Sequence, residues 1–337
     1  MAEQPIYNMP RNERRKRRGC SCLFIFLFLC FATFLLMILG VAAVLHGRTA
    51  ANFSIGDAIA VIPVEGVILE ADNTVEQIQR YASNSRIKGI LLRIESPGGT
   101  VGGSQEIYSA VIEARRKKPV YVSMGNTAAS GGYYIASAAE KIYANPGTVT
   151  GSIGVIFHLF NYQGITEKIG LQSEVVKSGK YKDIGSPTRP LLPEERKILQ
   201  GLINDTYDQF TEAILAMRRT QLDNAQKSIA TDRDGFWKTI LVDNPTSVPL
   251  NGEQLLRRVA DGRVYSGRQA LRIGLVDQLG SEREAIDALG QAVGLPKPHV
   301  IREREKPSLL NLLFGADGKS LLQPLQRNTA SLYYQME

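Results

Sequence analysis

The sequence predicts an α/β fold in which helices cover a mostly parallel β-sheet. Between residues 58 and 139, apolar, β-branched stretches alternate three times with segments of helical periodicity. The same alternation returns in residues 260–280. Parallel neighbours need long crossover connections, which the helices supply. With 337 residues, 44% hydrophobic and 22% charged, the chain is long enough for one large globular domain or two ordinary ones.

The first half of the chain contains the clearest elements. Strands are expected where short β-branched stretches are bounded by turn residues, and helices where apolar residues recur every three or four positions. The third strand leads into a run of small residues and then into a helix. The predicted strands are 58–64, 89–95 and 119–124, and the predicted helices are 75–81, 107–116 and the segment that follows Ser130.

The second half is less regular. Pro193 and Glu194 open a long amphipathic helix, because proline suits the first helical position and acidic residues suit the first turn. Residues 229–250 hold turn residues and the only tryptophan, and we interpret them as an insertion packed by Phe236 and Trp237. The remaining predicted elements are strands at 141–144, 149–157 and 171–177, the long helix at 193–219, the α/β stretch at 260–280 and a helix at 282–293.

The N-terminal region predicts a membrane anchor. Residues 23–45 form an uncharged apolar run of 23 residues. At about 1.5 Å per residue, such a helix crosses a hydrocarbon core of roughly 30 Å. The preceding residues 1–22 hold six Arg or Lys against two Glu, so this end is expected in the cytoplasm. A cleaved signal peptide ending near Ala50 or Ala51 is the alternative.

These features divide the chain into five parts. A basic cytoplasmic tail (1–22) and a single-pass anchor in the inner (cytoplasmic) membrane (23–45) are followed by a stem (46–57). The main domain (58–295, with the insertion at 229–250) is then expected on the extracytoplasmic, periplasmic side. The C-terminal tail (296–337) mixes charge with leucines, and we interpret it as a loosely ordered partner or membrane contact.

The composition excludes several classes of site. All three cysteines (Cys20, Cys22 and Cys30) lie in or beside the predicted anchor, so the exported part has neither a disulfide nor a thiol nucleophile. The three histidines have no zinc-ligand spacing, and no P-loop or dinucleotide fingerprint is present, so no metal or cofactor is expected. Most of the net charge of +7 lies in the basic tail, so it does not indicate nucleic-acid binding.

Ser130 is the first candidate for chemistry. In the stretch MGNTAASGGYY it stands between a predicted strand and a predicted helix, with Gly131 and Gly132 directly behind it. Unpaired N–H groups and the positive end of the helix dipole at such a turn suit a nucleophile whose attack creates an oxyanion. The alternative is that Ser130 simply caps the helix, as serines at helix starts commonly do.

Two glycine motifs are expected to meet near Ser130. Pro97, Gly98 and Gly99 follow one strand and Ser130 follows the next, and the carboxyl ends of parallel strands share one edge of a sheet. Glycines let a backbone N–H approach a ligand without hindrance from a side chain. The N–H groups of Gly99 and Gly131 are therefore a candidate oxyanion hole, although an ordinary turn would also explain SPGG.

A nucleophilic serine needs a base, and the residues leave two kinds open. His158 lies in the apolar stretch VIFHLF, where a histidine also suits simple packing. The other candidates are Lys177, Lys180 and Lys182 in VVKSGKYKDIGSP. A lysine acts as a base only if its pKa falls from about 10.4 toward 7 or 8, which requires burial and no nearby carboxylate. Asp183 counts against Lys182 unless the two side chains point to opposite faces.

Several of these motifs, taken together and in order, resemble a known family. The run MGNTAASGGYYIASAAEKIYANPGTVTGSIGV, with SPGG before it and SGKYKDIGSPTR and ADGRVYSGRQA after it, is similar to the short form of signal peptide peptidase A. That family consists of membrane-anchored serine proteases with the Clp protease/crotonase fold, a spiral of repeated ββα units. The resemblance covers about residues 58–280, but residues 229–250 have no counterpart in the pattern.

The resemblance implies a set of roles. Ser130 would be the nucleophile and Lys182 the general base, while Ser152 would orient the lysine. Gly99 and Gly131 would form the oxyanion hole. The histidine of the Clp proteases would align near Ser152 rather than at His158. The family also implies a homo-oligomeric dome in which the serine and the lysine come from neighbouring subunits.

The predicted function is a membrane-anchored serine endopeptidase with a Ser/Lys dyad. It would cleave remnant signal peptides and other extended apolar peptides on the extracytoplasmic side, without a metal, a cofactor or nucleic acid. One alternative is a catalytically silent membrane scaffold of the same fold, and another is a Clp-like peptidase that uses Ser130 and His158. Acyl-CoA hydratases and thioesterases share the glycine oxyanion hole, but export disfavours them because CoA is not expected outside the cytoplasm.

Overall fold

A computed structural model describes residues 26–37, 56–241, 250–302 and 333–335. The chain divides into two units, Met1–Ile55 and Gly56–Glu337. In the first unit, residues 26–37 form a helix whose side chains are almost all exposed. The fold described below is that of the second unit.

The predicted anchor is described only in part. Residues 26–37 of the run 23–45 are helical, as expected, and the rest of the run and the basic tail lie outside the described residues. Among the helices that the structure describes, none combines the length and the apolar composition needed to cross a bilayer.

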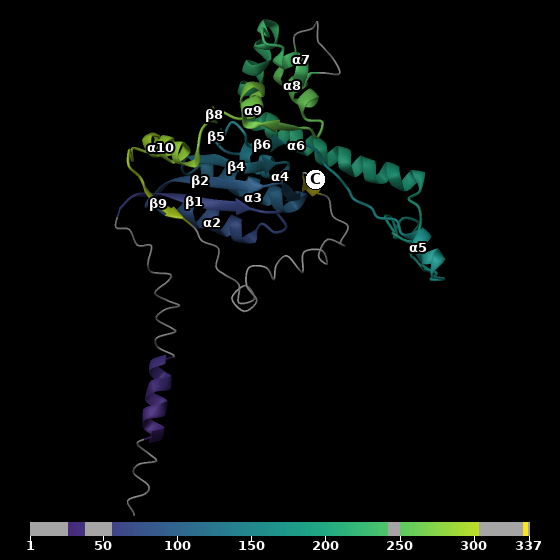
Figure 1. Cartoon of the computed structure of the whole chain (residues 1–337), viewed down its shortest axis with the longest axis horizontal. Coiled ribbons are helices and arrows are strands. Elements are labelled where there is room, and N and C mark those ends of the chain that lie inside the picture. The colour runs from purple at the N-terminus through teal and green to yellow at the C-terminus, as the bar shows by residue number, and fades with distance from the viewer. Residues whose placement is uncertain (1–25, 38–55, 242–249, 303–332, 336–337) are drawn as a thin grey trace, which may run out of the picture. The chain divides into compact units, whose positions relative to one another are not determined.

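The second unit is built on an eight-stranded sheet with the order β7-β6-β4-β2-β1-β9, which β5 and β8 extend beside β4 (Figure 1). The predicted mostly parallel arrangement is confirmed, since every pairing in this sheet is parallel except the one between β6 and β7. The strands are β1 (Ala58–Glu65), β2 (Ile87–Ser96), β4 (Val120–Ala129), β5 (Lys141–Ala144), β6 (Val149–Gly151), β7 (Val264–Ser266), β8 (Gln278–Leu279) and β9 (His299–Arg302).

Two hydrophobic cores sandwich the sheet. Because side chains alternate along a strand, Ala60 and Ile62 of β1 face one core while Ile59 and Val61 face the other. The larger core packs against α2 (Asp72–Ser83), α3 (Val101–Arg115), α4 (Gly131–Ser137) and α6 (Pro193–Lys227). The smaller core packs against α10 (Glu282–Ala292). Both faces are covered, as expected for β-branched strands without polar alternation.

Strand β4, which leads to the candidate serine, pairs with two different strands on the same side. Its first half pairs with β5 and its second half with β6. On its other side, the register with β2 shifts between Ile94 and Ser96, so β4 bulges at Gly125–Thr127. The Glu95 carboxylate accepts hydrogen bonds from the N–H groups of Asn126 and Thr127 at 2.7 and 3.1 Å. These hydrogen bonds satisfy the two backbone N–H groups that the bulge leaves without a partner in β2, and β4 continues to Ala129.

The described part of residues 229–250, which we interpret from the sequence as an insertion, packs around a buried tryptophan. Trp237 of α7 (Phe236–Ile240) is buried, its ring contacts that of Phe236, and its indole N–H donates to Ser228 Oγ at 2.9 Å. Residues 242–249 lie outside the described residues. The remaining short elements of this region are η1 (Ile229–Thr231), α8 (Gly252–Val259) and α9 (Gly267–Ile273).

Several predicted boundaries are wrong. The strand expected at 149–157 ends at Gly151, and residues 171–177 form no strand and are exposed. A β-prone segment becomes a strand only beside a partner, and the described part of the chain provides none there. Within the predicted tail, β9 adds to the sheet edge beside β1. A further strand, β10 (Tyr333–Gln335), pairs with β3 (Gly98–Thr100).

Candidate active site

Ser130 occupies a strained turn between β4 and α4. Its backbone φ of 52° and ψ of −116° place it, with Ser152, among the two non-glycine residues of the described chain that have positive φ. The Ser130 N–H donates to the Gly151 carbonyl, and its carbonyl accepts from the Tyr134 N–H, both at 2.8 Å. Such a conformation costs about 1–3 kcal/mol and persists only where the surroundings enforce it, which is common at functional sites.

The Ser130 hydroxyl is buried and has no hydrogen-bond partner. The residue is 1% exposed, and its Oγ has no hydrogen-bond partner in the structure. Ser130 stands at the N-cap position of α4, but its side chain makes no capping hydrogen bond, so the alternative that it simply caps the helix is wrong. A buried polar atom without a partner costs about 1–3 kcal/mol, so it calls for a functional explanation.

The two candidate oxyanion-hole glycines lie in adjoining elements. Gly131 is the buried first residue of α4, where backbone N–H groups lack partners within the helix. Gly99 is the middle residue of β3, and a Cβ there would collide with the carbonyl oxygen of Ile68, so the position admits only glycine. Helix α4 packs against β3.

Ser96 fixes the turn that carries Gly99. Its buried hydroxyl donates to the Gly66 carbonyl at 2.6 Å and accepts from the Gly98 N–H at 3.1 Å. In the sequence, SPGG is evident as a pair of glycines after a proline, and a role for its serine could not be predicted. Its signal is weak, because serine is common in ordinary turns.

Ser152 lies directly beside Ser130. The paired residues Ala129 and Gly151 end β4 and β6, and Ser130 and Ser152 are the next residues along each strand. Ser152 has a φ of 50°, is 7% exposed, and donates its N–H to the Arg263 carbonyl at 2.9 Å. It also lines a cleft of about 810 Å³, together with Ile203, Tyr207 and Gly262.

All four candidate bases, His158 and the three lysines, lie in a segment that leaves the sheet. We call residues 154–192 the arm; none of them is buried. Helix α5 (Gln163–Lys168), which belongs to the arm, lies apart from the sheet and its covering helices (Figure 1). Lys182 and His158 are both exposed, and neither donates to the Ser130 hydroxyl. Within one chain, therefore, the structure gathers Ser130, Ser152 and the two glycines but not a base.

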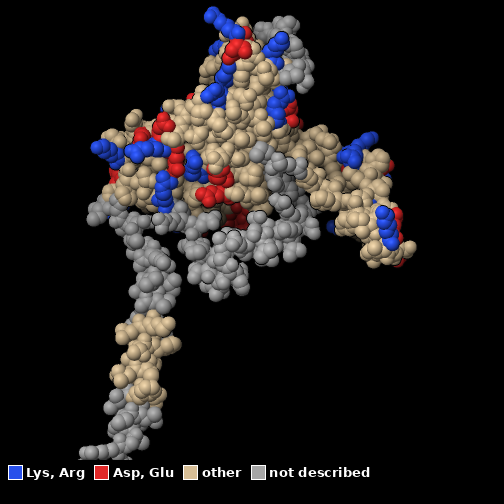
Figure 2. Space-filling model, viewed as in Figure 1, with Lys and Arg blue, Asp and Glu red and all other residues tan. Residues whose placement is uncertain are grey.

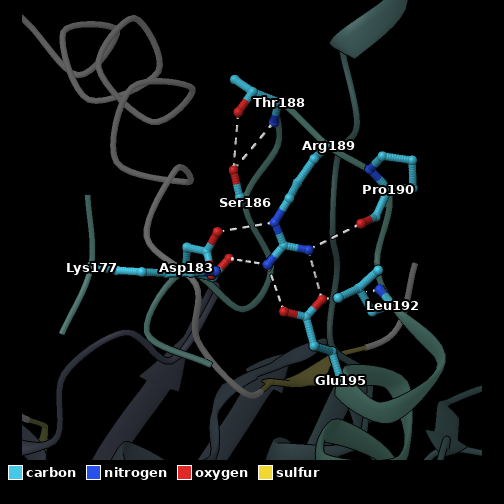
Figure 3. Close-up of polar contacts among 8 residues, drawn as sticks. All are labelled: Lys177, Asp183, Ser186, Thr188, Arg189, Pro190, Leu192 and Glu195. Atoms are coloured by element: carbon cyan, nitrogen blue, oxygen red, sulfur yellow. Dashed lines mark hydrogen bonds and ion pairs between the residues drawn. The ribbon is translucent and has the colours of Figure 1, made fainter. Parts of the chain in front are cut away.

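The arm ends in a cluster of charges at the start of α6 (Figure 3). The Asp183 carboxylate pairs with Lys177 and with Arg189, and Arg189 also pairs with Glu195. Hydrogen bonds from Arg189 and then from Lys177 hold the pKa of the Asp183 carboxyl well below its usual range. The sequence places Asp183 next to Lys182, but it does not predict Arg189 and Glu195 as partners, because their six-residue spacing carries no helical or strand signal.

Strand β10 reaches the predicted oxyanion hole from the C-terminal tail. It runs antiparallel to β3 and places Tyr334 opposite Gly99. The tail was predicted to be loosely ordered, and the aromatic, β-prone stretch SLYYQ was the available signal for a strand. The edge of β3 therefore accepts an added strand.

Family comparisons agree with this geometry. The sequence profile of peptidase family S49 matches residues 112–248 and 249–296, and that of Clp protease matches residues 61–149. The two profiles together include β1 to β6, α4 and the candidate nucleophile. The α/β fold with a mixed, mostly parallel sheet is of the Clp protease/crotonase type.

Individual relatives extend the match. A Synechocystis protein named as a protease is 40% identical over 264 residues, which are 77% of this chain and 80% of that protein. A Methanocaldococcus jannaschii protein named as a protease is 34% identical over 215 residues, 64% of this chain and 59% of that protein. An Enterococcus faecium protein named as signal peptide peptidase SppA is 35% identical over 230 residues, 68% and 58% of the two chains.

The chain thus spans less than two thirds of the length of the second and third of these relatives. The match nevertheless covers more than half of this chain, and it includes the strained serine, the glycine turn and the sheet that carries both. On these grounds, the chain belongs to peptidase family S49 and is a serine peptidase of this Ser/Lys-dyad family, similar to signal peptide peptidases.

Proposed function

We propose that this chain is a membrane-anchored endopeptidase in which Ser130 is the nucleophile and Lys182 the general base. The observation that carries the proposal is the Ser130 hydroxyl, which is buried, unpartnered and held in a strained turn at the start of α4. A hydroxyl that neither caps its helix nor bonds to a neighbour is available for attack on a substrate carbonyl.

The mechanism follows from the chemistry of a Ser/Lys pair. Neutral Lys182 takes the proton from Ser130 as Oγ attacks the peptide carbonyl carbon. The N–H groups of Gly99 and Gly131 stabilise the tetrahedral oxyanion. Protonated Lys182 then gives its proton to the leaving amine. In the second half of the reaction, Lys182 takes a proton from water as the water attacks the acyl-enzyme, and it returns that proton to Ser130 Oγ. No step requires a metal or a cofactor.

We further propose that Lys182 reaches Ser130 from a neighbouring subunit in a homo-oligomer, with Ser152 orienting it. The lack of buried residues in the arm supports this, because segments without a core of their own are stabilised by contact with a partner. Several large apolar side chains of the arm are exposed, among them Phe160 (70%), Ile169 (70%) and Val176 (97%). The position of Ser152 beside Ser130 suits its role.

Peptide substrates are proposed to bind by adding a strand to the edge of β3. The pairing of β10 with β3 supports this, since it shows that the edge can hold an extended segment opposite Gly99. Main-chain hydrogen bonds recognise any extended peptide, and apolar pockets beside them would favour remnants of signal peptides. The name of the Enterococcus faecium relative is in keeping with this substrate class.

The site is proposed to lie on the extracytoplasmic side of the inner membrane. The apolar run 23–45, with its basic N-terminal flank, supports a single-pass anchor with a cytoplasmic N-terminus. Such an anchor would hold the site close to the place where cleaved signal peptides are released.

The test uses the full-length chain in detergent and a fluorogenic apolar peptide. Ser130→Ala and Lys182→Ala should each reduce kcat/KM to background, while His158→Ala should keep most of the activity. A serine-reactive fluorophosphonate should label the wild type at Ser130 and lose that labelling in Lys182→Ala. Circular dichroism and the oligomeric mass check that each variant is folded.

The alternatives give different results. Normal cleavage by Ser130→Ala would disprove the nucleophile assignment. An inactive His158→Ala beside an active Lys182→Ala would show a Ser/His peptidase. A wild type that neither cleaves peptides nor reacts with the probe would support a catalytically silent scaffold.

A further inference from the structure

A chain of ion pairs fixes the residue that follows the proposed base (Figure 3). The two carboxylate oxygens of Asp183 have different partners: Oδ1 pairs with Lys177 Nζ, and Oδ2 accepts from Arg189 Nε at 3.0 Å. Arg189 Nη2 also donates to the Asp183 backbone carbonyl at 3.1 Å. Arg189 therefore holds both the side chain and the main chain of Asp183.

Glu195 anchors Arg189 to the rigid part of the fold. The Glu195 side chain is fully buried at the start of α6 and accepts from both terminal nitrogens of Arg189, at 2.8 and 2.5 Å. It also accepts from the Leu192 N–H at 3.0 Å, so it satisfies the backbone donor of the N-cap residue of α6. A bidentate pair of this kind fixes the guanidinium plane as well as its position.

This arrangement bears on the charge next to Lys182. A carboxylate close to a lysine stabilises the ammonium form, typically by 1–3 pKa units in proteins. Asp183 is adjacent in sequence, but its carboxylate is matched by Lys177 and Arg189, and none of the described ion pairs involves Lys182. The other charged groups here are Lys180 of the same loop and Glu195 of α6, whose charge Arg189 matches.

We propose that Arg189, held by Glu195, is a positioning residue that keeps the Asp183 carboxylate from acting as a counter-ion to Lys182. The inference rests on the proposed function, in which Lys182 must lose its proton to accept one from Ser130. The contact between Arg189 and Asp183 would then affect catalysis indirectly, through the protonation of Lys182 and not through contact with the substrate.

The test is the pH dependence of kcat/KM in the full-length protein. If a neutral lysine is required, activity rises with pH along an acidic limb. Arg189→Met leaves Asp183 with only Lys177, so Lys182 competes for the carboxylate and keeps its proton longer. The midpoint of that limb should move about one pH unit higher, which lowers kcat/KM about tenfold at a pH on the limb.

A second substitution separates electrostatics from loss of structure. Arg189→Met/Asp183→Asn removes the freed carboxylate and should return the midpoint to that of the wild type. Arg189→Lys, which keeps a cation beside Asp183, should shift the midpoint less than Arg189→Met. The exposed Arg196 on the first turn of α6 is the matched control, and Arg196→Met should leave the midpoint unchanged.

Some results would overturn the proposal. If Arg189→Met lowers kcat/KM equally at every pH, or if Asp183→Asn does not restore the midpoint, the cluster only stiffens the loop. Because Arg189→Met also leaves the buried Glu195 without its partner, Arg189→Met/Glu195→Gln serves the same test if the single variant does not fold. An active Lys182→Ala refutes the proposed function itself, whereas an inactive one beside an unshifted Arg189→Met profile refutes only this inference.

Discussion

At the scale of single residues, two serines with positive φ mark the site. Ser130 and Ser152 follow directly after paired residues of β4 and β6, and each is held by a backbone hydrogen bond at its N–H. Positive φ favours glycine, so a side chain there is retained at a cost in stability. In both places the side chain is a hydroxyl, which agrees with a role in proton transfer rather than in packing.

The buried ion pair between Arg218 and Asp277 should contribute strongly to the stability of the fold. Arg218 of α6 is 1% exposed, and its guanidinium donates to Asp277 Oδ2 at 2.7 Å and to the Gly274 carbonyl at 3.1 and 3.3 Å. Asp277→Asn leaves the arginine buried without its counter-charge and should lower the free energy of unfolding by about 3–5 kcal/mol. Chemical denaturation measures the change.

The control for that prediction lies on the same helix. Asp208 pairs with Arg257 at 3.4 Å, but about half of each side chain is exposed. Asp208→Asn should therefore change the free energy of unfolding by less than about 1 kcal/mol. Equal losses in the two variants would contradict the argument from burial.

At the scale of elements, β10 and a substrate should compete for the edge of β3. Removing residues 333–337 frees this edge, so the KM for an extended peptide should fall severalfold while kcat stays the same. A synthetic peptide with the sequence TASLYYQME, taken from the C-terminus, should inhibit the truncated protein competitively, and a scrambled peptide should not. An unchanged KM would show that β10 is not a competitor.

The junction between the arm and α6 should be sensitive to acid. Hydrogen bonds from Arg189 and from the Leu192 N–H lower the pKa of the Glu195 carboxyl from its ordinary 4.5 to about 2. A depressed pKa stabilises the folded junction above about pH 4.5, and this stabilisation is lost as the pH falls toward 2. The protection of residues 183–195 against hydrogen exchange, measured relative to the intrinsic rate at each pH, should therefore fall between these values.

Glu195→Gln provides the comparison for that experiment. It removes the carboxylate, so exchange in the same residues should already be fast at pH 5 and should depend less on pH. The neighbouring Glu194 is exposed, and Glu194→Gln should behave as the wild type does. A pH dependence in Glu195→Gln equal to that of the wild type would assign the acid sensitivity to another group.

At the scale of the whole molecule, charges of both signs are interspersed on the visible surface of the second unit. On the face shown in Figure 2, Lys and Arg are interspersed with Asp and Glu over the second unit, and they do not form a broad basic field on that face. Binding to nucleic acid depends on such a field. The basic excess of the chain instead lies largely in residues 1–22.

Assembly from mixed subunits tests the proposal that the dyad is shared. Ser130→Ala and Lys182→Ala should each be inactive alone. In a ring assembled at random from equal amounts of the two, half of the subunits carry an intact serine and half of their neighbours an intact lysine, so about one quarter of the sites are complete. Dissociated and reassembled mixtures should therefore recover about a quarter of the wild-type activity. Simple mixing without subunit exchange is the control, and no recovery after exchange would place the dyad within one chain.

The sequence alone determined the class of fold and most of the candidate site. Strands β1, β2 and β5 and helices α2 and α10 appear close to where periodicity predicted them, because these elements bury a regular face in one chain's own core. The turns at SPGG and ASGG were also evident, because glycine next to a short hydroxyl side chain is a local signal. Ser130, Gly99 and Gly131 could therefore be predicted before the fold was known.

Only the tertiary structure decided what depends on partners distant in sequence. The strand expected at 171–177 did not form because no segment among the described residues pairs with it, while β9 and β10 formed because β1 and β3 offered free edges. The positive φ of Ser130, its unpartnered hydroxyl and the pairing of Asp183 with Arg189 likewise depend on contacts across the fold. Local patterns specify which face of an element is apolar, but long-range packing determines which polar groups are satisfied and which remain available for chemistry.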